Sequence, residues 1–237
     1  MNILVTLCGR GGSKGIPGKN IKMLSGKPLI AYSIKHAQQL IEKFGGDIAL
    51  STDSNEIINV ASEYGVKSNY KRPPLLATDS IGKIDVIDDV LIYMESNNKR
   101  HYDYVIDLDI TSPLRHIDDL IAAFQLLISD EKALNIFSVS EASRNPYFNM
   151  VEIGNDDYAR LVKVGDFRTR QSSPKVYDMN ASFYIYRRAF FSQNLKSAVT
   201  DSSLIYVMEH ICFDIDEPLD FKIMDYLLSN NLLGFDL

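Results

Sequence analysis

The chain has 237 residues, of which 46% are hydrophobic, so it can bury a sizeable core as one domain spanning 1–237. Its net charge of −6 and pI of about 5.2 argue against the broad basic face of a nucleic-acid-binding protein. No apolar run is long enough to cross a bilayer. Cys8 and Cys212 lie far apart and outside any metal-binding pattern, so we expect a reduced, cytoplasmic protein without a membrane segment.

Apolar periodicity predicts strands and helices that alternate along most of the chain. In chain order the predicted elements are strand 2–7, helix 28–44, strand 47–50, helix 55–64, helix 84–94, strand 104–108, helix 117–128, strand 136–139, strand 182–186, strand 210–215 and a helix from Pro218. This alternation predicts an α/β fold: a Rossmann-like, doubly wound sheet of mainly parallel strands.

Residues 142–180 interrupt this rhythm. Short β-like pieces at 149–153 and 159–164 alternate there with charged and polar turns, and no long amphipathic helix is present. We interpret the segment as an inserted arm that projects from the sheet. Its apolar side chains would be covered by a second copy of the chain, which predicts a symmetric homodimer.

The stretch CGRGGSKGIPGKN, residues 8–20, follows the first predicted strand and is typical of an anion-binding loop. It fails the Walker A pattern at both ends, and it fails the dinucleotide fingerprint at the third glycine. Its glycines still let backbone N–H groups approach an anion, and three cations, Arg10, Lys14 and Lys19, supply charge. Residues 1–41 contain no Asp or Glu, although the whole protein is acidic. This favours a small polyphosphate as the ligand.

Four polar segments follow predicted strands, where ligands of open α/β sheets bind. They are the glycine loop, Ser51-Thr52-Asp53, residues 107–115, and Asp214-Ile215-Asp216. Asp214 and Asp216 would leave one face of the strand predicted at 210–215, and two such carboxylates suit Mg²⁺ beside phosphates. Asp216 could instead cap the helix that begins at Pro218. With the basic loop nearby, we favour the metal and therefore phosphoryl or nucleotidyl transfer.

Taken together, the motifs resemble those of the acylneuraminate cytidylyltransferase family, the CMP-nonulosonate synthetases. The similarity spans nearly the whole chain. The segments that carry it, in the family's order, are RGGSKGIPGKN (10–20), STDS (51–54), KRPPLLATD (71–79), TSPLR (111–115) and DIDEPLD (214–220).

The resemblance implies that the anomeric hydroxyl of a nine-carbon 2-keto sugar acid attacks the α-phosphorus of CTP, giving a CMP-sugar and pyrophosphate. Implied catalytic residues are Lys19, Arg10, Asp214 and Asp216, with both aspartates holding Mg²⁺. Implied nucleotide-binding residues are Arg10, Gly11, Ser13, Lys14, Lys19, Asn20, Arg72 and Lys83. Implied sugar-acid-binding residues are Asp109, Thr111, Ser112, Arg170, Gln171, Asp178, Asn180 and Tyr184. Arg170 would lie on the arm and cross to the partner subunit.

Three positions depart from the pattern of sialate enzymes. Asp109-Ile110 replaces a Gln-Pro pair, Asp178-Met179 precedes Asn180 where a basic residue is usual, and Lys83 stands where a serine near the nucleotide is expected. Asp109 can only accept hydrogen bonds when ionised, whereas the amide that it replaces can also donate. The segments LDITSPLR and YDMNAS are most similar to the legionaminate branch, whose sugars carry a second acylamino group.

Other functions stay open on the sequence alone. CMP-N-acetylneuraminate synthesis would use the same cytidylyl chemistry with another sugar acid. A sugar-1-phosphate nucleotidylyltransferase would keep the cationic loop but use a phosphate as the acceptor. An NAD-dependent dehydrogenase would need the fingerprint that fails here. A nucleotide sensor without enzymatic activity would have little need for the acidic pair.

Overall fold

A six-stranded sheet with the order β10-β6-β9-β5-β1-β4 forms the centre of the computed structural model, which describes residues 1–235 and 237. β9 runs antiparallel to β5 and β6, and the other strand pairs are parallel. The strands are β1 (Ile3–Cys8), β4 (Asp47–Ser51), β5 (Tyr104–Leu108), β6 (Asn135–Glu141), β9 (Tyr177–Arg187) and β10 (Ser203–Val207). The predicted mainly parallel sheet is confirmed.

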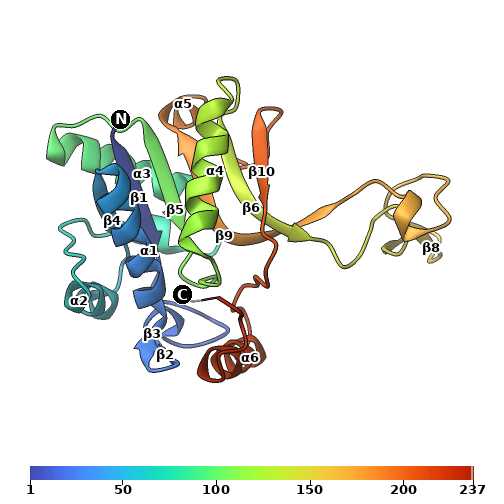
Figure 1. The fold of residues 1–237 in the computed structure, drawn as a ribbon, viewed down its shortest axis with the longest axis horizontal. Coiled ribbons are helices and arrows are strands. Elements are labelled where there is room, and N and C mark those ends of the chain that lie inside the picture. The colour runs from blue at the N-terminus through green and yellow to red at the C-terminus, as the bar shows by residue number, and fades with distance from the viewer. Residues whose placement is uncertain (236) are drawn as a thin grey trace.

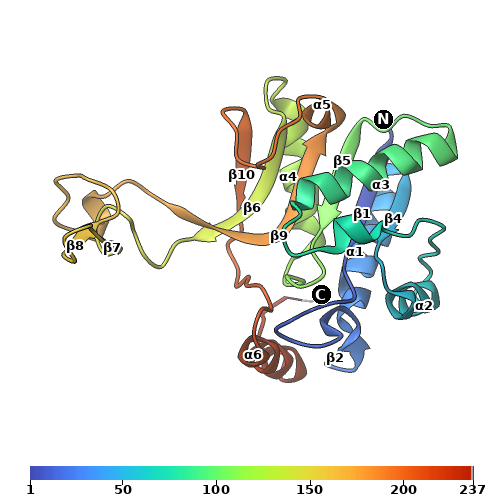
Figure 2. The ribbon, with the colours of Figure 1, turned by 180° about the vertical axis from the view of Figure 1, so that it is seen from behind.

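Helices cover both faces of this sheet, as Figures 1 and 2 show from opposite sides. α1 and α4 pack on one face, and α3 and α5 pack on the other. The helices are α1 (Leu29–Phe44), α2 (Asn55–Glu63), α3 (Lys83–Asn98), α4 (Ile117–Ser129), α5 (Arg188–Phe191) and α6 (Pro218–Ser229). The predicted doubly wound arrangement is therefore confirmed. No helix in the described part of the chain has the length and apolar content needed to span a membrane.

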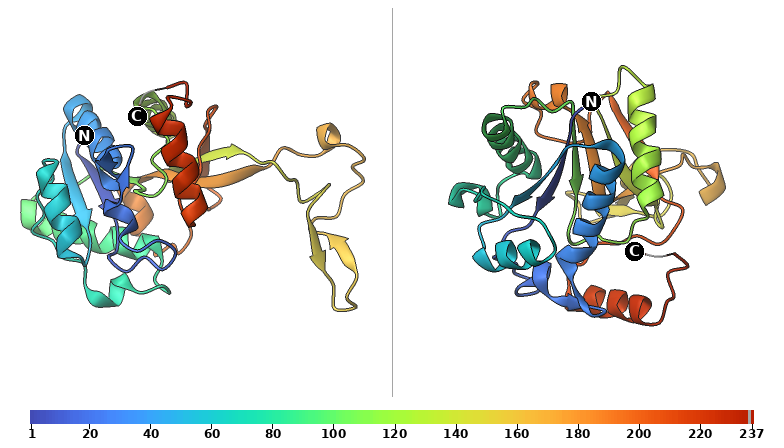
Figure 3. Two further views of the ribbon diagram at one scale, coloured as in Figure 1. Left: turned by 90° about the horizontal axis from the view of Figure 1, so that it is seen from below. Right: turned by 60° about the vertical axis from the view of Figure 1, so that its left-hand side comes forward.

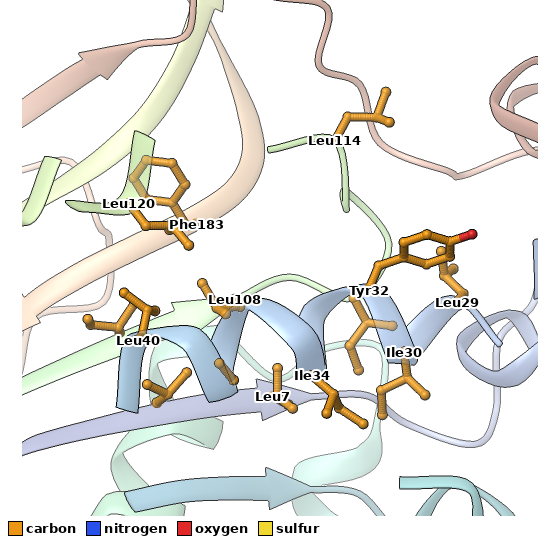
Figure 4. Close-up of a cluster of buried hydrophobic side chains, with 14 of the residues drawn as sticks. Leu7, Leu29, Ile30, Tyr32, Ile34, Leu40, Leu108, Leu114, Leu120 and Phe183 are labelled. Carbon is orange, nitrogen blue, oxygen red and sulfur yellow. The ribbon is translucent and has the colours of Figure 1, made fainter. Parts of the chain in front are cut away.

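The larger part of the core lies between α1, α4 and the sheet (Figure 4). Ile34 and Leu40 of α1 pack with Leu7 of β1, Leu108 of β5 and Phe183 of β9, and all five are buried. Full burial of such a side chain contributes about 1.5–3 kcal/mol relative to leaving it exposed. The apolar residues whose spacing predicted helix 28–44 thus form the face of α1 that packs against the sheet.

The prediction of a strand at 210–215 is wrong, because residues 211–216 form a loop without strand pairing. Ile215 is fully buried there and packs in the core without joining the sheet. The edge strand is instead β10, which pairs in parallel with β6. Three of its five residues are only partly buried and the other two are exposed, so it lacks the continuous apolar signal of a central strand.

Residues 142–176 project from the sheet as an arm between β6 and β9 (Figure 3, left). The arm carries a small antiparallel hairpin of β7 (Val151–Ile153) and β8 (Ala159–Leu161), both shorter than predicted. All six residues of the hairpin strands are exposed. β9 begins at Tyr177, so the strand predicted at 182–186 is only the inner part of a longer one. Dimerisation through the arm stays a prediction.

Candidate active site

A cavity of about 400 Å³ lies beyond the carboxyl ends of β1 and β5. This is the edge at which open α/β sheets bind ligands. The predicted site residues that line the cavity are Arg10, Ser13, Lys14, Lys19, Asn20, Arg72, Lys83, Asp109, Thr111 and Asp216. The fold therefore brings the glycine loop, the end of β5 and part of the acidic loop to one place.

The glycine loop is held against its neighbours by close backbone contacts. A Cβ atom at Gly15 would lie 2.5 Å from the carbonyl oxygen of Asp216, so only glycine lets the loop meet the acidic segment this closely. The N–H of Gly11 donates to Asp53 Oδ1 at 2.8 Å. Gly11 therefore ties the loop to the end of β4, and this N–H is not free for a phosphate here.

Lys19 joins the glycine loop to the acidic loop. It begins the short 3-10 helix Lys19–Ile21, and its ammonium donates to the carbonyl of Ile215 and lies 3.4 Å from Asp216 Oδ1. The neighbouring Asn20 is buried and donates from Nδ2 to the Arg10 carbonyl at 2.9 Å. These bonds fix both predicted catalytic cations on one side of the cavity.

Asp79, at the end of the segment KRPPLLATD, occupies the cationic side of the cavity. Its Oδ1 lies 2.5 Å from Arg10 Nη1, and its Oδ2 pairs with the Lys14 ammonium. Hydrogen bonds from Lys14 and Arg10 lower the pKa of Asp79, so this carboxylate is ionised at neutral pH. No role was predicted for Asp79 from the sequence, although the motif contains it. A bound polyphosphate would have to displace it from both cations.

Arg72 lies at the end of β4 and is almost fully buried. Its Nη2 donates to the carbonyl of Ser51 at 2.7 Å, and its Nε donates to the Ser51 hydroxyl at 3.0 Å. Its own backbone N–H donates to the Thr52 carbonyl. The guanidinium thus lines the cavity while it holds the loop after β4.

Asp214 and Asp216 lie on the loop before α6, and not at a strand end as the sequence predicted. The loop is fixed by Ile215, whose N–H donates to the Thr111 carbonyl at 2.9 Å. The N-cap of α6 is Glu217, and Asp220 Oδ2 accepts the backbone N–H groups of Asp216 and Glu217. Capping is therefore done by the neighbours of Asp216, whose own carboxylate lies beside the cavity.

The acidic pair fits a divalent cation. Burial, together with the charges of Asp109 and Asp216, raises the pKa of Asp214. Its Oδ1 is buried and has no hydrogen-bond partner among residues 1–235 and 237. A cation would satisfy this oxygen and offset the repulsion. The described residues contain no preformed cluster of three or more His, Cys, Asp or Glu, but Mg²⁺ beside phosphates needs only one or two carboxylates.

The predicted sugar-acid residues are only partly brought together. Tyr184 is half-buried, with its ring centroid 5.2 Å from Lys83 Nζ. Ser112 is fully buried and donates to the Asn180 carbonyl, and the Asn180 side chain bonds to Ser138 and Ser140. Neither Ser112 nor Asn180 is among the described residues that line the main cavity.

Three further predicted residues lie away from this cavity. Asp178 is exposed on β9, where it pairs with Ser140 in the sheet. Arg170 and Gln171 line a second cavity of about 480 Å³ at the base of the arm. Arg170 Nη2 donates there to the carbonyl of Ala142 at 2.8 Å. Within one chain, the arm therefore does not complete the main cavity.

Comparisons with known proteins match the chain to one family over most of its length. The family described as Cytidylyltransferase matches residues 5–224. The chain is 42% identical to "Post-translational flagellin modification protein B" of Campylobacter coli, over 98% of this chain and 97% of that protein. It is also 42% identical to the CMP-N,N'-diacetyllegionaminic acid synthase of Campylobacter jejuni, over 96% and 95%.

A solved structure shares the fold across the whole length. CMP:2-keto-3-deoxy-manno-octonic acid synthetase complexed with CTP superposes with a TM-score of 0.68 at 17% identity, over 98% of this chain and 100% of that one. At this identity the likeness concerns the fold alone, whereas the family match and the relatives above concern the sequence. The chain belongs to the cytidylyltransferase family.

Proposed function

We propose that this protein transfers CMP from CTP to a nonulosonic acid, with legionaminic acid the favoured acceptor, and releases pyrophosphate. The observation that carries the proposal is that Lys19 and Asp216 line the same cavity and lie 3.4 Å apart there. A cationic loop for a triphosphate and Asp216, one of the two proposed metal ligands, thereby face the same space. Membership of the cytidylyltransferase family and the 42% identity to a CMP-N,N'-diacetyllegionaminic acid synthase support the choice of nucleotide and sugar.

In this proposal the reaction depends on positioning and on charge neutralisation. Arg10, Lys14 and Lys19 would hold the triphosphate, with Lys19 closest to the α-phosphate. Asp214 and Asp216 would hold Mg²⁺, which would neutralise charge on the phosphate oxygens. The anomeric hydroxyl of the sugar acid would attack the α-phosphorus in line, and pyrophosphate would leave.

We also propose that the protein acts as a cytoplasmic homodimer in which the arm completes the partner's site. Arg170 and Gln171 line the cavity at the base of the arm and not the main cavity. The arm's hairpin exposes apolar side chains, with Ile153 77% exposed. A second chain that covers the hairpin would bury these side chains and bring Arg170 to a sugar-acid site.

Pyrophosphate release tests the proposed function. The protein is incubated with CTP, Mg²⁺ and a panel of nonulosonic acids, and ATP and dTTP are tested in parallel. Release is expected with CTP and at least one acid, and excess EDTA should stop it. Release that persists in chelator, or none with any acid of the panel, would contradict the proposal. A preference for ATP or dTTP with a sugar 1-phosphate would redirect it to the sugar-1-phosphate nucleotidylyltransferases.

A further inference from the structure

The ammonium group of Lys83 lies among carboxylates. Lys83 is the first residue of α3, and its Nζ lies 2.6 Å from Asp109 Oδ2 and 2.8 Å from Asp107 Oδ2. The sequence assigned Lys83 to the nucleotide. The structure gives its charge two partners at the end of β5, and because Lys83 also lines the main cavity, its contact with the nucleotide stays a prediction.

Asp107 anchors this ion-pair cluster from inside the protein. It is fully buried, and its Oδ1 accepts a hydrogen bond from the Thr6 hydroxyl at 2.8 Å. Burial alone would lower the pKa of Lys83, but Asp107 and Asp109 outweigh burial and raise it well above its usual value. The lysine therefore stays charged at neutral pH and holds the two carboxylates together.

Asp109 is fixed through its side chain and through its backbone. Oδ1 accepts both the N–H and the hydroxyl of Thr111 at 2.8 Å, and Oδ2 accepts from Lys83. The backbone N–H donates to Ser182, and the carbonyl accepts from Ser33. A carboxylate offers about four acceptor positions, so one is left over. The side chain is 19% exposed and lines the main cavity.

A lone carboxylate at this place would repel both substrates of the proposed reaction, since CTP and the sugar acid are anions. Lys83 carries one positive charge beside the two carboxylates of Asp107 and Asp109, so it offsets part of the repulsion. With the lysine in place, Asp109 can present a hydrogen-bond acceptor and add less negative charge to the cavity than a lone carboxylate would. Burial would raise the pKa of Asp109, but Lys83 and Thr111 outweigh burial and lower it, so the group accepts and does not donate.

Lys83 and Asp109 are also two of the positions at which this chain departs from the sialate pattern. A neutral serine and a neutral glutamine are expected there, and the structure shows that their charged replacements touch each other. An aspartate at 109 without the lysine would add uncompensated negative charge, whereas the lysine without Asp109 would still pair with the buried Asp107. The pair therefore behaves as one coupled change in the cavity wall.

We propose that Asp109 is a specificity-determining residue that accepts a hydrogen bond from an acylamino N–H of the sugar acid, and that Lys83 is the positioning residue that holds it. This inference rests on the proposed function. An amide N–H only donates, so it matches a fixed acceptor. A sugar acid with fewer acylamino groups leaves the carboxylate without its partner, which costs transition-state binding.

The test compares kcat/KM for N,N'-diacetyllegionaminate and N-acetylneuraminate in the wild type and in Asp109→Gln. The wild type should prefer the first acid, and Asp109→Gln should lower this preference by at least about tenfold. The KM for CTP should stay unchanged, because the acceptor faces the sugar. Asp109→Asn is measured in parallel, so that a folding defect in one variant does not decide the result.

Lys83→Ser tests the positioning role. It leaves two neighbouring carboxylates without a cation, so it should lower the melting temperature and raise the KM for the sugar acid but not for CTP. Adding Asp109→Gln should restore part of both losses, because the pair is coupled. Lys196→Ser is the matched control. It removes an exposed ion pair with Asp85, which lies on α3 like Lys83. It should change neither the melting temperature nor the KM for the sugar acid.

Each contrary outcome has a definite meaning. An unchanged preference in an Asp109→Gln enzyme that still turns over would overturn the inference, as would an equal loss for both acids or a rise confined to the KM for CTP. Additive effects of Lys83→Ser and Asp109→Gln would overturn the coupling. Failure of the wild type to turn over any sugar acid would instead remove the proposed function, and this inference with it.

Discussion

The main cavity and the arm both carry predicted site residues, but they differ in how much of their structure one chain supplies. The loops around the cavity are fixed by buried contacts, such as the bond from Ile215 to the carbonyl of Thr111. The arm is held by local contacts, such as the edge-to-face packing of Tyr147 on Phe167 at 5.6 Å between centroids. Val164 on the arm is 97% exposed. The residues proposed to bind the nucleotide therefore lie in a cavity that one chain builds, whereas Arg170 and Gln171 on the arm lie outside it.

The largest effect is expected from the acidic pair. Asp214→Asn and Asp216→Asn should each lower kcat by at least about 10²-fold, because each removes a charge that would hold the proposed Mg²⁺. Asp214→Asn should fold at least as stably as the wild type, since it removes a buried carboxylate whose pKa is raised by burial and by neighbouring carboxylates. Turnover and melting temperature are measured together.

Asp220→Asn gives the matched control for the acidic pair. Asp220 accepts the N–H groups of Asp216 and Glu217 at the start of α6, so its loss should cost about 1 kcal/mol of stability and leave turnover largely intact. A near-normal rate in Asp214→Asn or Asp216→Asn would remove that residue from the metal site.

The second effect would show whether the arm acts across the dimer. Arg170→Ala should be inactive alone, and so should Asp216→Asn. After subunit exchange the mixture should recover up to about a quarter of wild-type turnover, since half of the dimers would carry one intact site. Size-exclusion chromatography and differently tagged chains verify the heterodimers. No recovery despite proven heterodimers would place Arg170 in its own chain's site or outside any site.

A smaller effect is expected at Asp79, which pairs with Arg10 and Lys14 and would compete with a bound phosphate for them. Asp79→Asn should tighten CTP binding a few-fold at low salt, and the gain should shrink as salt is added. Titration calorimetry without sugar acid measures this directly. Weaker CTP binding in the variant would show instead that Asp79 contacts the bound nucleotide.

The smallest effect concerns the anchor of the acidic loop. His210 Nε2 lies 2.8 Å from Asp119 Oδ2 on α4, and this hydrogen bond raises the pKa of His210 above its ordinary value near 6.5. The stabilisation is complete below pH 6.5 and is lost as pH rises through the raised pKa. Between pH 6 and 8 the melting temperature should fall more in the wild type than in His210→Gln.

His101 supplies the control for this pH dependence, because its side chain also lies beside a carboxylate, that of Glu95, but is 70% exposed and contributes little. The protein with His101→Gln should follow the wild-type curve across the same range. Parallel curves for the wild type and His210→Gln would mean that the imidazole of His210 does not contribute to stability through Asp119. The expected difference is only a few degrees, because the His210 side chain is partly exposed.

The sequence predicted the parts of the fold that depend on local pattern. Helix 28–44 followed from apolar spacing, and the loop after β1 followed from its glycines and cations. The segment 210–215 was wrongly predicted as a strand because some of its apolar residues pack in the core without joining the sheet. Ile215 packs in the core from a loop. β10 was missed because an edge strand that is half exposed lacks a continuous apolar run.

The candidate site was predictable as a set of segments but not as a set of contacts. Motifs indicated that the glycine loop and Asp216 would meet, and they do at Lys19. The pairing of Lys83 with Asp109 could not be predicted, because nothing in the sequence says which carboxylate a cation will face. The same holds for Asp79, whose partners follow only from the folding of the loop that carries it.

The most direct test of the account is to identify what the protein makes from CTP and N,N'-diacetyllegionaminic acid with Mg²⁺. Mass spectrometry of the products is combined with pyrophosphate measurement over the same time course. The account predicts one CMP-sugar and one pyrophosphate for each CTP consumed, and no product from Asp216→Asn. Hydrolysis of CTP without a sugar conjugate, or a conjugate formed equally well by Asp216→Asn, would contradict it.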